Sequence, residues 1–338
     1  MAEKMMTNKA LRVSAVVLSI ALHMPLLAQA KVSPEEAAKL GTTLTPLGAE
    51  KAGNADGSIP EWTGGLPKNA GTADDRGFLS DPFASEQPLF TITAQNVDQY
   101  KDKLTPGQVA MFKRYPDSFK IPVYPTHRSA TAPQSVLDDV KANAVNTKLV
   151  EGGNGLENFK TAYPFPIPQN GLEVIWNHIT RYRGEQVRMV TNHAAVLKGG
   201  DYVLVKRERD LMFIYGREGL TPADLDNTLF FYKYVVTAPS KLAGSALVVQ
   251  ETLDQVLAIR KAWRFNRGER RVRRLPMLAY DAMQPDTNGM ATADVVDAYN
   301  GAPDRYDWKL IGKKELYIPY NSYEIASSDL KYKDIIKA

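Results

Sequence analysis

The second half of the chain, after Asn170, contains runs of β-branched and aromatic residues at regular spacing, with turn residues between them. In the run 228–238 both sets of alternate positions are mainly apolar, which is typical of a strand with two sheltered faces. The connections between runs are too short for crossover helices, so the pattern predicts an antiparallel meander. The expected strands cover 172–182, 185–197, 201–208, 210–216, 228–238, 245–253, 256–265, 269–275 and 308–319.

Several of these expected strands are apolar on both faces, which an exposed one-sided sheet would not tolerate. We expect one face to pack on the helices of the first half. The other face either closes into a filled core or lines an apolar cavity, since a large curved antiparallel sheet often holds a hydrophobic ligand. Five aromatic residues on expected strands are candidate ligand contacts, although each such residue is more often core: Trp176, Phe231, Tyr234, Trp263 and Tyr317.

The first half, residues 31–168, shows a different pattern, with short helices on a path rich in proline and glycine. Ser33 to Glu36 and Thr105 to Gln108 are capping boxes with proline at the first helical position, so each predicts the start of a helix. A third helix is expected over 133–149. We therefore predict a mainly β protein of the α+β type. Its helical region and its antiparallel region, 169–338, should form one structural unit.

Residues 1–30 have the pattern of a cleaved secretory signal peptide. Three basic residues precede an apolar stretch over 13–27, and Ala28-Gln29-Ala30 supplies a small-x-small cleavage site. A transmembrane anchor is disfavoured, because the stretch is shorter than the roughly 20 apolar residues that a spanning helix needs. The leader predicts export to the periplasm, as a free protein or in peripheral contact with the outer membrane.

The amino-acid composition excludes several kinds of functional site and partner. The chain has no cysteine, so disulfides, thiolate metal sites and cysteine nucleophiles are excluded. Its net charge of +4 is too small to predict nucleic acid as a partner. His127, His178 and His193 stand in no metal-ligand spacing, and there is no nucleotide-binding or nucleophile-elbow motif, so we expect no metal, cofactor or linear catalytic motif. His178 and His193 fall on neighbouring expected strands and could pair, although ordinary sheet histidines are commoner.

The strongest local charge feature is the run from Arg264 to Arg274, which contains six arginines around an expected hairpin turn at 266–269. A solvated hairpin face is the simplest interpretation. The alternative is contact with an anionic partner, either a lipid headgroup or an acidic patch on an envelope protein. The candidate contact residues are Arg264, Arg270, Arg271, Arg273 and Arg274.

Several motifs together are similar to those of one bacterial family. They are LTPLGAE at 44–50, AGNADGSIPEWTGG at 52–65, KAW at 261–263, RRVRR at 270–274, AYD at 279–281 and YIPYN at 317–321. On these motifs the chain resembles domain-of-unknown-function family 1329 along its whole length. The resemblance implies a LolA/LolB-like half-barrel, in which a curved antiparallel sheet surrounds a short helical plug and an apolar cavity for acyl chains. It also implies an exported Gram-negative protein that accompanies transporters of the resistance-nodulation-division class, without agreed catalytic residues.

Members of this family look longer than this chain and continue into further strands after the stretch 329–334. We therefore expect this chain to lack those strands, which would leave an unpaired sheet edge and a thinner cavity wall.

The leading interpretation is a periplasmic carrier or chaperone for a lipid, a lipoprotein acyl chain or another hydrophobic substrate, serving an envelope transporter. An apolar cavity can bind lipid without a catalytic group, because burial contributes about 0.8 kcal/mol per methylene. Two alternatives are a hydrolase whose site is assembled in space and an outer-membrane β-barrel. Charged residues within the expected strands count against the second. A purely structural envelope protein is the remaining possibility.

Overall fold

The computed structural model describes residues 32–335, except residues 198, 277, 279, 285, 286 and 288. The chain divides into two units, Met1–Ala30 and Lys31–Ala338, and the described residues all belong to the second. The expected signal peptide lies outside the described residues. Within the described part, no helix combines the length and the apolar character that crossing a membrane requires.

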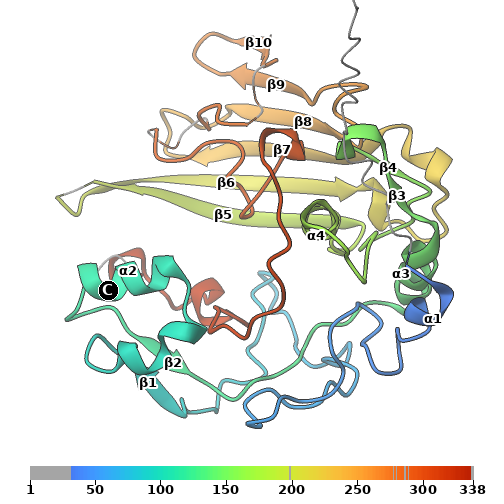
Figure 1. Cartoon of the computed structure of the whole chain (residues 1–338). Coiled ribbons are helices and arrows are strands. Elements are labelled where there is room, and N and C mark those ends of the chain that lie inside the picture. Colours follow the sequence, from blue (N-terminus) through green and yellow to red (C-terminus); the bar gives the residue numbers. More distant parts are fainter. Residues whose placement is uncertain are drawn as a thin grey trace, which may run out of the picture. The chain divides into compact units, whose positions relative to one another are not determined.

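The largest element is a six-stranded antiparallel sheet in which every strand pairs with its neighbour in sequence, in the order β10-β9-β8-β7-β6-β5 (Figure 1). This meander confirms the antiparallel sheet that the strand spacing predicts, since short hairpins can join only antiparallel neighbours. The strands are β5 (Gln186–Val196), β6 (Tyr202–Phe213), β7 (Thr228–Ala238), β8 (Ala246–Thr252), β9 (Lys261–Asn266) and β10 (Arg271–Arg274).

Side chains alternate between the two faces of this sheet, and the strand register shows which of them share a face. Tyr234 on β7 lies opposite Arg209 on β6 and Leu247 on β8, so these three point to the same side. Tyr234 and Leu247 are 3% and 5% exposed, and we call their side the covered face. Phe231 and Val248 point to the other side, where they are 41% and 39% exposed. We call this side the open face.

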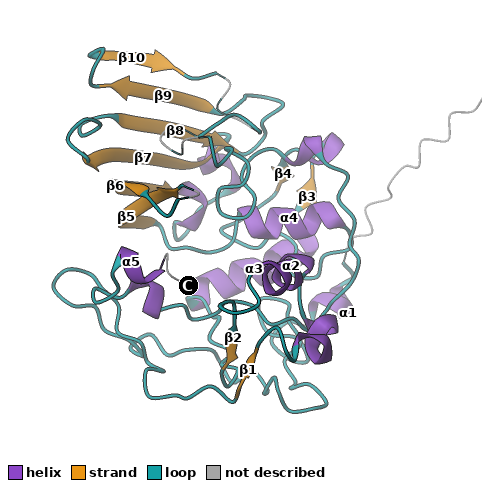
Figure 2. Cartoon of the chain, turned by 90° about the vertical axis from the view of Figure 1, so that its left-hand side faces the viewer, coloured by secondary structure: helices purple, strands orange, loops and turns teal. Residues whose placement is uncertain are grey.

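The covered face packs against helix α4 (Gly171–Ile179) and against residues 275–305, which we call the strap. Trp176 of α4 belongs to the same buried cluster as Phe213 at the end of β6. Leu275 and Leu278 of the strap pack on a second cluster formed by β6, β7, β8 and β9. Figure 2 shows α4 on one side of the sheet. On the other side, the Tyr332 ring of α5 (Tyr332–Ile335) stacks on Tyr202 of β6, which points to the open face by strand alternation.

The first half forms short helices, and both capping boxes are confirmed. The Glu36 amide donates to the Ser33 hydroxyl, and the Gln108 amide donates to the Thr105 hydroxyl, each over 3.2 Å. The buried clusters that contain the residues of these helices include no residue of the six-stranded sheet. The N-terminal helices therefore contribute no residue to the buried clusters of the sheet, which form with α4, with the strap and with Leu156, Phe159 and Phe165 of the first half.

The remaining elements are small. They are α1 (Pro34–Ala37), η1 (Val97–Lys103), α2 (Pro106–Arg114), α3 (Gln134–Asn146), η2 (Glu151–Gly153), η3 (Ile214–Gly216), η4 (Pro222–Leu225), η5 (Pro303–Arg305), η6 (Glu324–Ala326) and α5 (Tyr332–Ile335), where η marks a 3₁₀ helix. Two further pairs of strands are β1 (Phe90–Ile92) with β2 (Ile121–Val123), and β3 (Lys148–Leu149) with β4 (Leu156–Glu157).

The expected strand 172–182 is wrong, because most of this segment is the helix α4. Asn170 caps the helix, and its side-chain oxygen accepts the Glu173 amide over 3.0 Å. The apolar residues Leu172, Trp176 and Ile179 stand at helical spacing, which a short apolar run does not distinguish clearly from a strand.

Four other expected strands also differ from the structure. The strand predicted over 256–265 begins only at Lys261, because the Asp254 carboxylate accepts the amides of Val256 and Leu257 and holds a turn there. Residues 308–319 form no regular strand. The two strands predicted over 201–208 and 210–216 are the single strand β6, followed by η3.

Candidate functional site

A patch of large apolar side chains lies on the open face of the six-stranded sheet. Val272 on the edge strand is 65% exposed, and Met212 is 40% exposed, close to the values of Phe231 and Val248. Such side chains are usually buried, so their concentration on one face marks a surface with a binding role. We call the group the open-face patch, and its members are Met212, Phe231, Val248, Trp263, Phe265 and Val272.

The strand register arranges this patch as two groups of paired side chains. Val272 lies opposite Phe265, and Trp263 lies opposite Val248. Phe231 lies opposite Met212 and is a diagonal neighbour of Val248, whose direct partner on β7 is Lys233. Directly paired side chains on one face of a sheet stand about 5 Å apart and diagonal ones about 7–8 Å, so the patch spans five strands with Lys233 at the step from β7 to β8.

Charged side chains border the patch. The Asp210 carboxylate accepts from Arg188 over 2.7 Å and lies 2.9 Å from the Lys233 ammonium. These two hydrogen bonds hold the pKa of Asp210 below its usual value. By strand alternation, basic side chains outnumber acidic ones on the open face: Arg188, Lys206, Lys233, Lys261 and Arg274 against Glu208 and Asp210. The border therefore suits an anionic or amphipathic partner better than a cationic one.

The five aromatic residues that the sequence singled out do not form one site. Phe231 and Trp263 both belong to the open-face patch. Tyr234 lies on the covered face, with the Arg207 guanidinium 4.6 Å from its ring centre. Trp176 is buried in α4, where its ring nitrogen donates to the Gly153 carbonyl over 2.9 Å.

Tyr317, the fifth of these aromatic residues, lies away from the sheet. Its ring packs edge-on against Phe90 and Tyr100, and its amide donates to the Lys103 carbonyl over 2.9 Å. Tyr317 therefore belongs to the hydrophobic cluster of the first half.

The five candidate arginines of the β9–β10 hairpin are likewise divided. Arg264 points to the covered face, and Arg274 points to the open face. Arg270 lies in the turn, with a left-handed φ of 51°. Arg273 forms an ion pair with Glu269 over 2.8 Å, which reduces its charge for a partner. Arg271 is exposed on β10.

The sequence reasoning missed Met212, Val248, Phe265 and Val272 as members of the patch. A signal for Val272 was present, because it stands alone between two pairs of arginines, at 270–271 and 273–274. Met212 could not be assigned to a face, because the division of β6 into two expected strands removed the alternation between them.

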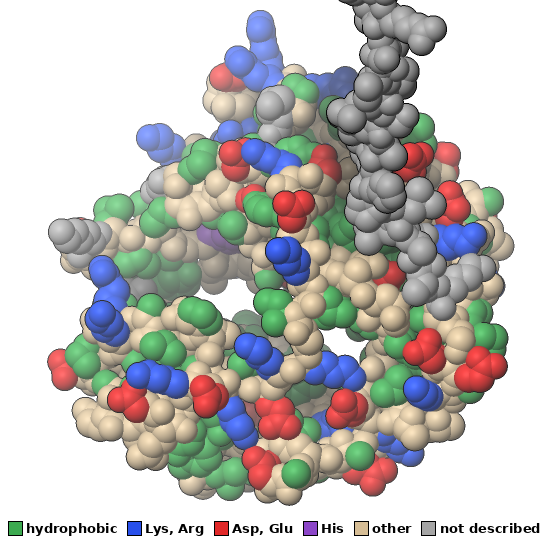
Figure 3. All heavy atoms as spheres, in the orientation of Figure 1, with side chains coloured by type: hydrophobic (Ala, Val, Ile, Leu, Met, Phe, Trp, Pro, Cys, Tyr) green, Lys and Arg blue, Asp and Glu red, His purple; other side chains and the backbone are tan. Residues whose placement is uncertain are grey.

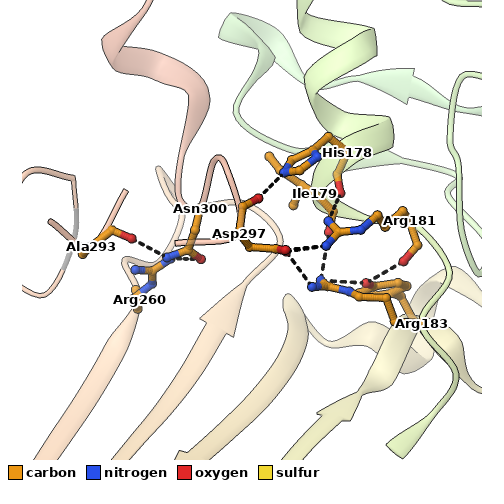
Figure 4. A network of polar contacts seen from close by, with 9 residues as sticks. His178, Ile179, Arg181, Arg183, Arg260, Ala293, Asp297 and Asn300 are labelled. Atoms are coloured by element: carbon orange, nitrogen blue, oxygen red, sulfur yellow. Dashed lines mark hydrogen bonds and ion pairs between the residues drawn. The ribbon is translucent and has the colours of Figure 1, made fainter. Parts of the chain in front are cut away.

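Polar contacts fasten the strap over the covered face (Figure 4). The Asp297 carboxylate accepts from Arg181 over 2.5 Å and from Arg183 over 2.8 Å, and the Asp297 carbonyl contacts a ring nitrogen of His178. On the other side, Arg260 donates to the Asn300 side chain over 2.9 Å.

The same Arg260 forms an ion pair with Glu251 over 2.5 Å. Both side chains are almost fully buried, so each charge depends on its partner. The strap is thus held at two points over the covered face, whereas the open-face patch has no comparable cover among the described residues.

Neither the histidines nor the described cavity provide a catalytic set. His127 contacts the Glu86 carboxylate over 2.6 Å and stacks on Phe83. The alternative in which His178 and His193 pair across neighbouring strands is excluded, because His178 lies on α4 and only His193 lies on a strand, β5. No group of metal-ligating side chains occurs among the described residues. A cavity of 370 Å³ is lined by residues with amide, ammonium and aliphatic side chains: Ala142, Asn143, Asn146, Asn158, Lys160 and Pro222.

Comparisons with known proteins identify the family. The family model described as "Protein of unknown function (DUF1329)" matches residues 91–338. The chain is similar to the uncharacterized protein PA3922 of Pseudomonas aeruginosa, with 64% identity over 309 residues, or 91% of this chain and 68% of that protein. A crystal structure of a DUF1329 family protein from Desulfovibrio piger is 16% identical with a TM-score of 0.29, over 39% of this chain and 49% of that chain. The chain belongs to the DUF1329 family.

Proposed function

We propose that this protein is a periplasmic carrier that binds the hydrocarbon part of an amphipathic molecule on the open face of its six-stranded sheet. The observation that carries the proposal is the open-face patch, in which Met212, Phe231, Val248 and Val272 stay 39–65% exposed beside the half-buried Trp263 and Phe265. Its basic border suits an anionic headgroup. A curved sheet of the LolA/LolB type, the half-barrel that the motifs imply, would bring these side chains around such a chain.

The free energy of burying a hydrocarbon chain gives the affinity that we expect. Full burial contributes about 0.8 kcal/mol per methylene, and a chain that lies on one face leaves roughly half of its surface in water. A chain of about sixteen carbons would then gain at most ~6 kcal/mol, which corresponds to a dissociation constant of tens of micromolar. Binding of this strength is reversible, as a carrier requires.

Delivery to an envelope transporter of the resistance-nodulation-division class is the second part of the proposal. A carrier that binds its cargo on an uncovered face can release it to a partner that offers a more enclosed apolar site. Arg274 points to this face and Arg270 lies in the adjoining turn, and both would contact an acidic partner or a headgroup.

The test is uptake of a fluorescent fatty-acid probe by delipidated protein. We expect saturable binding to the wild type and about tenfold weaker binding to Val248→Asp, because the carboxylate places a charge at the centre of the patch. The matched control is Ile311→Asp, since Ile311 is an 86% exposed aliphatic residue outside the sheet. It should bind like the wild type. Absence of probe binding to the wild type, or equal binding to Val248→Asp, contradicts the proposal.

A further inference from the structure

A group of polar side chains lies on the covered face, at the side where β5 forms the edge of the sheet. His193 on β5 lies opposite Val205 of β6, which is buried on the covered face. Thr191 is two residues from His193, and Arg209 is four residues from Val205, so strand alternation places both on the same face. All three polar residues are half-buried. They are neither part of the open-face patch nor part of the contacts that hold the strap.

The Arg209 side chain extends past Thr191 to His193. Its main chain lies opposite Met189, and its Nη2 reaches Nε2 of His193 over 2.5 Å. Thr191 stands between Met189 and His193 along β5, so the guanidinium passes Thr191. Because a guanidinium can only donate, Nε2 of His193 accepts this hydrogen bond, and its ring is the neutral form protonated at Nδ1.

Two hydrogen-bonding atoms in this group are buried without a hydrogen-bond partner in the described structure. They are Nε of Arg209 and the hydroxyl oxygen of Thr191. Arg209 contacts His193 and the ring of Tyr232, whose centre is 6.0 Å from the guanidinium, and neither neighbour carries a negative charge at neutral pH. A sheltered polar atom without a partner is energetically unfavourable, so both positions favour a ligand that accepts hydrogen bonds.

Other sheltered arginines of the covered side show what Arg209 lacks. Arg260 has the Glu251 carboxylate, and Arg183 has the Asp297 carboxylate. Within the described residues, Arg209 forms no ion pair with a carboxylate. A guanidinium removed from water requires a counter-charge for stability, and a bound anion can supply one.

We propose that Arg209, Thr191 and His193 form a binding site for an oxyanion, either a carboxylate or a phosphate. Nε and Nη2 lie on one edge of the guanidinium, so an oxyanion held by Nε would sit beside His193 and accept from the Thr191 hydroxyl. The three side chains are half-buried, so part of the group is exposed to solvent. Figure 3 shows openings in the molecular surface beneath the sheet. This site is separate from the open face and does not rest on the proposed carrier function.

The test is calorimetric titration of the full chain with inorganic phosphate and with octanoate, at constant ionic strength with chloride as the balancing anion. We expect about tenfold weaker binding to Arg209→Gln, and about fivefold weaker binding to Thr191→Val, which removes a single donor. The matched control is Lys113→Gln. Lys113 is exposed on α2, outside the sheet, so its loss changes the net charge equally and should leave binding unchanged.

The two anions distinguish the possible sources of the oxyanion. Arg209-dependent binding of phosphate indicates a free ion, whereas Arg209-dependent binding of octanoate alone indicates the headgroup of an amphiphile. If Arg209→Gln does not fold, Arg209→Lys keeps the charge and loses the planar edge, and it should bind more weakly than the wild type. Anion binding that is absent from the wild type, or undiminished in the Arg209 and Thr191 variants, overturns the proposal. Val248→Asp should retain anion binding even if fatty-acid binding fails.

Discussion

The two faces of the six-stranded sheet are built from the same strands and yet have opposite environments. Val248 and Val249 are neighbours on β8, and their side chains are 39% and 6% exposed. On the covered face the strap and α4 supply packing partners, so the side chains there form closed clusters. On the open face comparable apolar side chains have no such partner among the described residues. The difference shows that the cover, and not the strand sequence, decides which face is core.

The cover itself depends on a few charged contacts. Arg260 and Asp297 connect the sheet and α4 to a strap with little regular structure. We make four predictions about this contrast between the faces, in order of decreasing expected effect.

Breaking the buried ion pair should have the largest effect. Arg260→Met leaves the Glu251 carboxylate buried without its cation, and we expect a loss of about 3–5 kcal/mol in the free energy of unfolding. The double variant Arg260→Met/Glu251→Leu should recover most of this loss, because no buried charge then remains. Urea denaturation measures both. Equal losses in the single and double variants would show that the pair does not act as a unit.

The adjacent valines of β8 provide a matched comparison of the faces. Val249→Ala should destabilise the protein by about 2 kcal/mol, since it removes buried methyl groups and leaves a cavity. Val248→Ala should change stability by less than ~0.5 kcal/mol, because its side chain is already in contact with water. Thermal unfolding of both variants gives the comparison. Similar losses at the two positions would mean that the open face is also covered in solution.

Weakening the strap at its other contact should have a smaller effect. Asp297→Asn removes the charge that Arg181 and Arg183 share, and we expect a loss of about 1 kcal/mol because the group is partly exposed. Hydrogen exchange should become faster in residues 290–305 and in α4. The control is Asp281→Asn, whose ion pair with Arg305 is more exposed. If the control variant accelerates hydrogen exchange equally, the contacts of Asp297 do not specifically hold the strap in place.

The smallest effect concerns pH on the open face. Arg188 and Lys233 lower the pKa of Asp210 in the folded protein, so the unfolded state binds this proton more readily. The stabilisation is therefore complete above the ordinary aspartate pKa of about 4 and is lost as the pH falls through the lower folded value. Asp210→Asn should flatten the acid limb of the stability curve. An unchanged acid limb would show that the contacts of Asp210 with Arg188 and Lys233 do not contribute to the pH dependence of stability.

Local patterns in the sequence predicted the sheet but not its cover. Strand β7 was predicted with the bounds Thr228–Ala238, because alternation and β-branched residues coincide there. Helix α4 was missed, because its apolar run is short and fits a strand as well as a helix. The fastening at Asp297 joins residues 116 positions apart, and no periodic pattern records such a pairing. For the same reason, the open face could be recognised only from the structure.

Quenching of tryptophan fluorescence by a dibrominated fatty acid tests the central claim most directly, because Trp263 lies in the open-face patch. The account predicts that bound fatty acid quenches the wild type, that Trp263→Phe removes most of this quenching, and that Trp308→Phe retains it. Quenching that persists in Trp263→Phe and disappears with a tryptophan outside the patch would contradict the account.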